Sequence, residues 1–276
     1  MRIVPMDKLP LEVVVDVFNR GFKDYVIPVQ MDSYILKDYI FVNDISLADS
    51  FAALDDKDVA QAFTFTGLRG KGSWVGGLAV DPGHRGLGFG KAVLAAQVER
   101  VKKLGQDDLW LECLEDNDVA MRMYQKVGFK QARKVHFMQC DDPKVVPADA
   151  PEHERRDASI SEVLPVYDKE HIWPKAPESL RRLAGVHIEV AVKDGNIVGY
   201  LIAFPGVEVT YLWDLSANVY GDVLLNGLIR TLETKQLSIA NLHSKALLSM
   251  LQKRGFVITY TLEVLRLKLR QGILPW

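Results

Sequence analysis

Residues 80–91 read VDPGHRGLGFGK, and the fold of the chain can be worked out from this glycine-rich stretch. Residues 73–80 before it have the composition of a strand, and residues 91–101 after it carry apolar side chains at helical spacing. The stretch therefore predicts a turn that leads into a helix N-terminus. Such a turn offers unpaired backbone N–H groups to an anion, and its glycines let the anion approach closely. The expected ligand is a phosphate or pyrophosphate.

Two common phosphate-binding loops do not fit this stretch. A P-loop needs Gly-x-x-x-x-Gly-Lys-Ser/Thr, but Arg85 stands in place of its first glycine and Ala92 in place of its hydroxyl residue. A dinucleotide-binding loop needs Gly-x-Gly-x-x-Gly, but the spacing here is that of Gly86, Gly88 and Gly90. Neither of these classes of nucleotide-binding protein is indicated.

Residues 85–90 match a third pattern, Arg/Gln-x-x-Gly-x-Gly/Ala, and resemble the coenzyme A pyrophosphate loop of the GNAT (Gcn5-related) N-acetyltransferases. Residues 117–129 resemble the same family's Asn-x-x-Ala-x-x-x-Tyr-x-x-x-Gly-Phe signature at every named position. The two motifs occur in the family's order, with one predicted helix and one predicted strand between them. The resemblance implies an α/β fold, built on a twisted α+β mixed sheet flanked by helices, and acetyl-CoA as the cosubstrate.

Composition and charge are those of an ordinary globular protein. Of the 276 residues, 48% are hydrophobic and 25% are charged, and the net charge of −2 gives no general attraction to nucleic acid or to an anionic membrane. Residues 1–10 lack the pattern of a secretory signal, and no apolar run is long enough to span a bilayer. The two cysteines, Cys113 and Cys140, have no metal-ligand spacing. We therefore expect a cytoplasmic protein with no metal, nucleic-acid partner or membrane partner.

Tyr124 is the predicted general acid. When an amine attacks the thioester, coenzyme A leaves as a thiolate, and a phenol can protonate or hydrogen-bond that sulfur. The spacing of Tyr124 to Asn117 and to the Gly128-Phe129 pair matches the family. This match favours the catalytic role over that of a tyrosine packed on an amphipathic helix. Asn117 is expected to cap the same helix and to bond the pantetheine.

Glu112 interrupts the apolar strand predicted over residues 108–114. One interpretation is that its carboxylate faces solvent on a half-buried strand. The other is that Glu112 accepts a proton from the attacking ammonium, directly or through a water, because amines are mostly protonated at neutral pH. Some relatives have a glutamate at the same place relative to the signature tyrosine. Both interpretations remain open at this point.

The resemblance also implies where coenzyme A binds. Relatives splay two parallel strands apart and hold the pantetheine arm between them, which here involves the backbone of Leu78 and Val80. The Gly76-Gly77 pair in this strand predicts a bulge or a close backbone approach. The implied contacts are Leu78, Ala79, Val80, Arg85, Gly86, Leu87, Gly88, Phe89, Gly90, Lys91, Asn117 and Tyr124.

The N-terminal residues predict two helices, over residues 11–22 and 32–40. In the resemblance these helices form one wall of the acceptor-substrate site, which places Phe22, Tyr25 and Tyr34 near the bound amine. The alternative is that these aromatic side chains belong to the core.

Residues 1–141 are expected to form the catalytic domain, and the polar, proline-rich residues 142–154 are expected to form a linker. The further strands expected in the first domain span residues 46–54, 58–68 and 130–141. Residues 155–276 read as a weaker copy of the first domain. The elements expected there are helices at 159–170, 178–183 and 222–231, strands at 187–192, 196–204, 207–215 and 237–242, and a closing helix around 250–256.

The repeat is clearest where residues 250–256 (MLQKRGF) match residues 123–129 (MYQKVGF) at five of seven positions. The second copy lacks the residues predicted to bind coenzyme A and to act as the acid in the first domain. Residues 215–221 have neither the arginine nor the series of glycines, and Leu251 stands in place of Tyr124. We therefore expect a degenerate domain that does not bind coenzyme A. It would shape the acceptor site or mediate assembly, and the Trp173-Pro174 pair could face that site.

The sequence thus predicts a tandem protein whose N-terminal domain transfers an acetyl group from acetyl-CoA to a primary amine of a small molecule or peptide. The resemblance implies that the amine attacks directly in a ternary complex, and neither cysteine lies in a context that suggests an activated thiolate. Two alternatives are a non-catalytic acyl-CoA-binding regulatory or scaffold protein, and an acyltransferase that uses another acyl-CoA. The sequence indicates neither the acceptor amine nor the oligomeric state.

Overall fold

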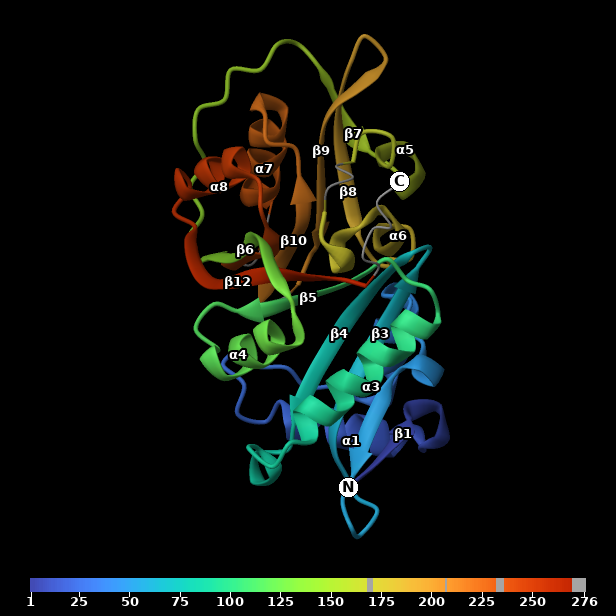
Figure 1. The fold of residues 1–276 in the computed structure, drawn as a ribbon. Coiled ribbons are helices and arrows are strands. Elements are labelled where there is room, and N and C mark those ends of the chain that lie inside the picture. Colours follow the sequence, from blue (N-terminus) through green and yellow to red (C-terminus); the bar gives the residue numbers. More distant parts are fainter. Residues whose placement is uncertain (168–170, 207, 232–235, 270–276) are drawn as a thin grey trace, which may run out of the picture. The chain divides into compact units, whose positions relative to one another are not determined.

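The computed structural model describes residues 1–167, 171–206, 208–231 and 236–269. The chain divides into two compact units. The first unit contains residues 1–132 together with the C-terminal segment that begins at Val264, and the second contains residues 133–263 (Figure 1). The chain therefore leaves the first unit, forms the second, and returns to the first.

The first unit is built on a mixed sheet. Its strands are β1 (Arg2–Pro5), β2 (Phe51–Leu54), β3 (Ala60–Arg69), β4 (Gly72–Val80), β5 (Asp108–Leu114) and the part of β12 (Val257–Lys268) that begins at Val264. They lie in the order β1-β2-β3-β4-β5-β12. Strands β1 to β4 are antiparallel neighbours, whereas β4 and β5 run parallel. The predicted mixed sheet is confirmed.

Helices cover both faces of this sheet (Figure 1). The α-helices are α1 (Leu11–Gly21), α2 (Ser33–Val42), α3 (Phe89–Lys103) and α4 (Asp118–Val127), and the short 3-10 helices are η1 (Met6–Lys8), η2 (Leu47–Asp49) and η3 (Pro82–His84). Phe18 of α1 packs against Phe63 with ring centroids 5.4 Å apart, whereas Phe89 and Val93 of α3 pack with Ala62. Because successive side chains of a strand point to opposite faces, Ala62 and Phe63 bury one helix on each side.

Polar caps fix the ends of α2 and α4. Asp32 accepts hydrogen bonds from the backbone N–H groups of the first turn of α2. Asn117 accepts one from Ala120 N, and α4 ends at Gly128, which has a φ of 107° that favours glycine. The structure thus confirms the predicted capping role of Asn117.

The second unit is a further mixed sheet with helices. Its strands lie in the order β12-β6-β11-β10-β9-β8-β7, and β10 and β11 run parallel. The new strands are β6 (Lys130–Cys140), β7 (Glu154–Asp157), β8 (His187–Lys193), β9 (Asn196–Phe204), β10 (Val209–Leu215) and β11 (Gln236–Leu242). The helices are α5 (Ile160–Val163), η4 (Trp173–Lys175), α6 (Pro177–Leu180), α7 (Val219–Thr231) and α8 (Lys245–Gln252).

The geometry of α8 supports the internal repeat. Ser244 caps α8 by accepting a hydrogen bond from Leu247 N, as Asn117 caps α4. Gly255 follows α8 with a φ of 93°, eleven positions after the cap (255 − 244), the same separation as between Asn117 and Gly128 (128 − 117). In this register Leu251 occupies the position of Tyr124.

Several predicted boundaries differ from the structure. Residues 46–50, predicted as strand, contain the 3-10 helix η2, and the predicted linker already contains the start of β7 at Glu154. The closing helix spans Lys245–Gln252, and the long strand β12 after it was not predicted. Residues 168–170, in the predicted helix 159–170, and residue 207, in the predicted strand 207–215, lie outside the described residues.

The division into units also differs from the sequence-based boundary at residue 141. Most of β6 lies in the second unit, which begins at Arg133, and its residues from His136 to Cys140 pair with β11. The end of β12 lies in the first unit, where Arg266 donates to both carboxylate oxygens of Asp108 on β5, at 2.8 and 2.6 Å. Such partners far apart in the sequence cannot be read from local patterns.

Arg254 is a buried cation that holds α7 in the second unit. Its side chain lies 2.6 Å from the carboxylate of Asp222 and donates a hydrogen bond to Asn226. We expect Arg254→Met to lower the free energy of unfolding by about 3 kcal/mol, because it leaves a partly buried carboxylate unpaired. Thermal unfolding followed by circular dichroism measures this. The control is Lys253→Met, the same substitution at the exposed neighbour; equal losses in both variants would contradict the prediction.

Candidate active site

Strands β4 and β5 separate soon after they begin. They pair from Gly72 with Asp108 to Trp74 with Trp110, and beyond this point no β4–β5 pair occurs among the described residues. The register of β4 with β3 shifts between Thr64 and Thr66, which places a bulge at Gly76-Gly77. The predicted splay and the predicted bulge are both confirmed.

The bulge requires glycine for two different reasons. A Cβ atom on Gly76 would lie 2.7 Å from the Ile45 side chain and 2.8 Å from the Trp74 ring, so there is no room for a side chain. Gly77 has a φ of 148°, which other residues rarely adopt. Beyond Trp74, the edge of β4 on the side of β5 has no pairing partner in β5 among the described residues.

A cavity of about 180 Å³ lies in this gap. It brings together most of the side chains that the sequence singled out for chemistry and for acceptor binding. Its lining residues are Phe22, Tyr25, Trp74, Val75, Gly76, Gly77, Leu78, Leu111, Glu112, Cys113, Asn117, Ala120 and Tyr124. Tyr34 is not among them and is 72% exposed, so the structure does not bring this predicted acceptor residue to the cavity.

Tyr124 lies on α4 and is buried, with its ring 5.7 Å from that of Phe129. Burial raises the pKa of Tyr124 well above its usual value, and the neighbouring Cys113 and Tyr25 raise it further. Burial likewise raises the pKa of Tyr25 to about 12, with smaller contributions from Cys113 and Asp116. Both phenols therefore remain protonated at neutral pH and can act as hydrogen-bond donors.

Glu112 lines the cavity from β5, and its position is fixed by Trp74. The indole Nε1–H of Trp74 donates to Glu112 Oε2 at 2.8 Å. Tyr39 of α2 lies nearby: burial raises the pKa of its phenol, the charge of Glu112 raises it further, and its hydroxyl donates to Gly76 O at 2.5 Å. This arrangement favours the interpretation in which Glu112 faces the gap between the strands over the one in which it faces bulk solvent.

Sequence reasoning missed Trp74 and Tyr39 as parts of this site. Trp74 lies two positions before the Gly76-Gly77 bulge. A buried indole N–H needs a hydrogen-bond acceptor, and this requirement was the signal in the sequence that could have identified Trp74. Tyr39 is five positions from the predicted Tyr34 on the same helix, and only the packing of α2 decides which of the two faces the sheet.

The glycine-rich turn has the geometry that its sequence predicts. Gly86 and Gly88 have φ values of 78° and 88°, and Gly88 precedes the first turn of α3. The hydrogen-bond ladder of α3 begins with Ala92 N donating to Gly88 O, so the N–H groups of the preceding first-turn residues lie outside that ladder. Gly90 packs closely on β4, where a Cβ atom would lie 3.1 Å from the side chain of Val80.

Side chains of the turn point in different directions. The guanidinium of Arg85 donates to Val80 O at 3.2 Å and Gly21 O at 3.3 Å, so in this structure it ties the turn to the end of α1. Phe89 is buried in the core, whereas Leu87 is 63% exposed and Lys91 is exposed. Contacts of Phe89 with a ligand would therefore come from its backbone.

Within the described ranges, no group of three or more His, Cys, Asp or Glu side chains is placed to hold a metal ion. In the same residues no helix has the length and hydropathy needed to cross a membrane.

Residues 20–129 match the model described as the acetyltransferase (GNAT) family. Among solved structures, a tandem GNAT protein from the clavulanic acid biosynthesis pathway has a TM-score of 0.73 at 14% identity, covering 98% of this chain and 99% of its own. A GCN5-related N-acetyltransferase from Sphaerobacter thermophilus has a TM-score of 0.66 at 14% identity, covering 98% of this chain and 95% of its own. The chain therefore has the tandem GNAT fold.

Curated relatives match over a short stretch. A ribosomal protein bS18-alanine N-acetyltransferase from Haemophilus ducreyi is 39% identical over 54 residues, which is 20% of this chain and 37% of that protein. The enzyme of the same name from Escherichia coli strain K12 is 36% identical over 55 residues, with the same coverage. The chain thus spans little more than a third of the length of these relatives.

Proposed function

We propose that the first unit is an N-acetyltransferase that transfers the acetyl group of acetyl-CoA to a primary amine by direct attack in a ternary complex. The observation that carries the proposal is the cavity between β4 and β5, which gathers Glu112, Asn117 and Tyr124. The geometry of the glycine-rich turn and the family of residues 20–129 support it. The pyrophosphate would bind at the N-terminus of α3, and the pantetheine would bond the backbone of Leu78 and Val80.

An amine that arrives as an ammonium must lose one proton before it can attack and a second as the amide forms. Glu112, held by Trp74, takes the first proton directly or through a water, and the neutral nitrogen then attacks the thioester carbonyl. The second proton leaves the nitrogen of the resulting adduct for solvent. The carbon–sulfur bond then breaks, and the hydroxyl of Tyr124 faces the leaving thiolate. Because the pKa of Tyr124 is raised above that of a thiol, its role is chiefly to stabilise the thiolate by a hydrogen bond.

The proposed acceptor is a primary amine of a small molecule or a peptide. Two of the relatives are named for acetylation of an alanine of a ribosomal protein, which makes a peptide N-terminus one class to test. Phe22 and Tyr25 line the cavity and would contact the acceptor. The role of Tyr34, at the exposed start of α2, stays a prediction.

The second unit is proposed not to bind coenzyme A. Residues 215–221 carry no series of glycines like that of the first unit, and the position of Tyr124 is occupied by Leu251, which is fully buried in the core. The idea that Trp173 faces the acceptor site stays a prediction.

A calorimetric titration of acetyl-CoA into the full-length protein, followed by an assay of amine acetylation, tests the proposal. We expect one site per chain and turnover with at least one class of primary amine. Two sites would contradict the assignment of the second unit. Binding without turnover of any amine would favour the alternative of a regulatory or scaffold protein, and preference for another acyl-CoA in competition would identify a different acyl donor.

We expect Glu112→Gln to lower turnover roughly 100-fold at neutral pH, because glutamine keeps the hydrogen bond to Trp74 but cannot take a proton. The loss should diminish as the pH rises and more of the amine is already deprotonated in solution. Steady-state rates as a function of pH measure this. A rate close to that of the unmodified protein at pH 7 would instead assign the base to a water chain.

A further inference from the structure

A second cavity, of about 310 Å³, lies within the second unit. Parallel strands β10 and β11 pair from Val209 with Gln236 to Leu212 with Ile239, and the cavity opens past the end of this pairing. Its lining residues are Val166, His171, Tyr200, Asp214, Leu215, Ser216, Ala217, Asn218, Leu242, His243, Ser244 and Leu247. This cavity is larger than the cavity of the first unit. The acetyl transfer proposed for the first unit gives it no role.

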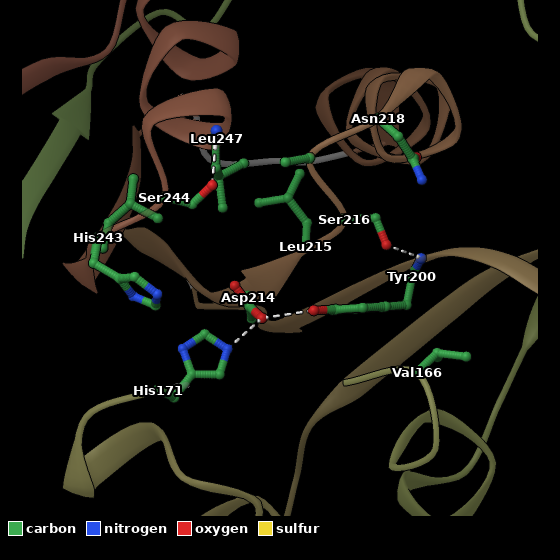
Figure 2. Close-up of a pocket in the computed structure, with 12 residues that line it drawn as sticks. Val166, His171, Tyr200, Asp214, Leu215, Ser216, Asn218, His243, Ser244 and Leu247 are labelled. Atoms are coloured by element: carbon green, nitrogen blue, oxygen red, sulfur yellow. Dashed lines mark hydrogen bonds and ion pairs between the residues drawn. The ribbon is translucent and has the colours of Figure 1, made fainter. Parts of the chain in front are cut away.

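A buried network of polar side chains forms one wall of this cavity (Figure 2). Asp214 Oδ2 accepts from the hydroxyl of Tyr200 at 2.8 Å and lies 3.0 Å from His171 Nε2. The side chains of His171 and Asp214 are only 7% and 4% exposed. An ionised carboxylate can only accept hydrogen bonds, so Nε2 of His171 carries the proton that is shared with Asp214.

Two acceptor atoms of this network are left without a partner among the residues that the structure describes. His171 Nδ1 is buried and has no hydrogen bond. Asp214 uses only Oδ2, and Figure 2 shows its other oxygen directed away from His171 and Tyr200, toward the side of the cavity formed by Ser244 and Leu247. Buried polar atoms are normally satisfied, so His171 Nδ1 points to a ligand that donates, and the second oxygen of Asp214 offers that ligand a further acceptor.

Asp214 is negatively charged at neutral pH. Burial alone would raise the pKa of Asp214, but the hydrogen bond from His171, the charge of Lys175 and the hydrogen bond from Tyr200 lower it below its ordinary value. Lys175 acts from a distance: its ammonium is buried and forms no hydrogen bond with a described residue. The carboxylate therefore still lacks a direct cationic partner at its second oxygen.

The helix ends near this cavity do not supply an anion site. Asn218 at the start of α7 accepts from Tyr220 N and Gly221 N, and Ser244 accepts from Leu247 N at the start of α8. These N–H groups, which could have bound a phosphate, are satisfied by the chain itself. The cavity thus differs in kind from the turn of the first unit.

From this geometry we infer that the second unit binds a small molecule that carries a protonated primary amine, with its ammonium donating to the free oxygen of Asp214 and to the ring of His171. A charge-assisted hydrogen bond to a buried carboxylate is stronger than one from a neutral donor. The apolar side chains of Leu215, Leu242 and Leu247 would hold the carbon chain of the ligand. The site is independent of the proposed acetyl transfer.

Histidine ring resonances of the full-length protein, recorded by NMR, test this site directly, because the chain has six histidines and two of them line the cavity. The probes are n-butylammonium, 1-butanol and butyrate, which share their carbon chain and differ in charge. We expect n-butylammonium to shift the His171 resonances saturably. The neutral alcohol should need at least about tenfold higher concentration, as for the loss of one charge-assisted bond. Equal shifts with butyrate, or no shift with any probe, would overturn the inference.

Three variants complete the test. Asp214→Asn should weaken n-butylammonium binding about tenfold or more. Ala217→Trp, at an exposed lining position, should block the cavity without touching the buried network, so it decides the question if Asp214→Asn fails to fold. Ala120→Trp is the matched control, because Ala120 lines the cavity of the first unit. Binding that survives Ala217→Trp but is lost in Ala120→Trp would refute the site.

Discussion

We expect Tyr124→Phe to lower the turnover of acetyl transfer by roughly 10- to 1000-fold while acetyl-CoA still binds. The substitution removes only the hydroxyl. The ring that packs 5.7 Å from Phe129 is retained, so the cavity should keep its shape. Because burial keeps this phenol protonated, its loss removes a donor that is present throughout the working pH range. Steady-state rates and a calorimetric titration, made on the same preparation, separate the two effects.

The control for this variant is Tyr211→Phe, at a tyrosine that is 57% exposed in the second unit and outside both cavities. It should leave the rate unchanged. If Tyr124→Phe also leaves the rate unchanged, the donor to the leaving sulfur is a water and not this tyrosine. If it instead abolishes acetyl-CoA binding, the hydroxyl acts in binding the cosubstrate.

The second large effect is expected for Gly88→Val, which should weaken acetyl-CoA binding roughly 100-fold, about the loss of two hydrogen bonds to a charged group at ~1.5 kcal/mol each. Gly88 has a φ of 88°, and a Cβ atom there would meet nothing within 4 Å. A valine would therefore strain the turn and project into the open space where the pyrophosphate is proposed to bind. Calorimetric titration of acetyl-CoA measures the change.

Gly70→Val is a matched control for this effect. Gly70 also has a positive φ, 55°, and a Cβ atom added to it would likewise meet nothing within 4 Å, but it lies in the turn between β3 and β4. Both valines should lower the thermal stability by a similar amount, because both impose a left-handed backbone on a β-branched residue. Only Gly88→Val should reduce acetyl-CoA affinity. Equal affinities in the two variants would argue against the turn as the pyrophosphate site.

Features that depend on neighbouring residues could be predicted from the sequence. Gly86 and Gly88 predicted the left-handed turn before α3, Gly76-Gly77 predicted the bulge, and Asn117 predicted a helix cap, because each depends on local backbone geometry. The repeat of α4 and α8 could also be recognised from the sequence, because it is a local pattern of residues. These motifs lie within residues 20–129, which match the acetyltransferase (GNAT) family model.

Which side chains contact one another could be seen only in the folded chain. The pairing of β5 with the end of β12 joins Asp108 and Arg266, and the network of the second unit joins His171 to Asp214. Likewise, packing turns Tyr39 toward the sheet and leaves Tyr34 exposed on the same helix. These contacts depend on the register of strands and on the faces that helices bury, which residues far apart in the sequence fix together. Local sequence patterns predict the backbone geometry of a site. The charged side chains of the site and their hydrogen-bond partners come together only when the chain folds.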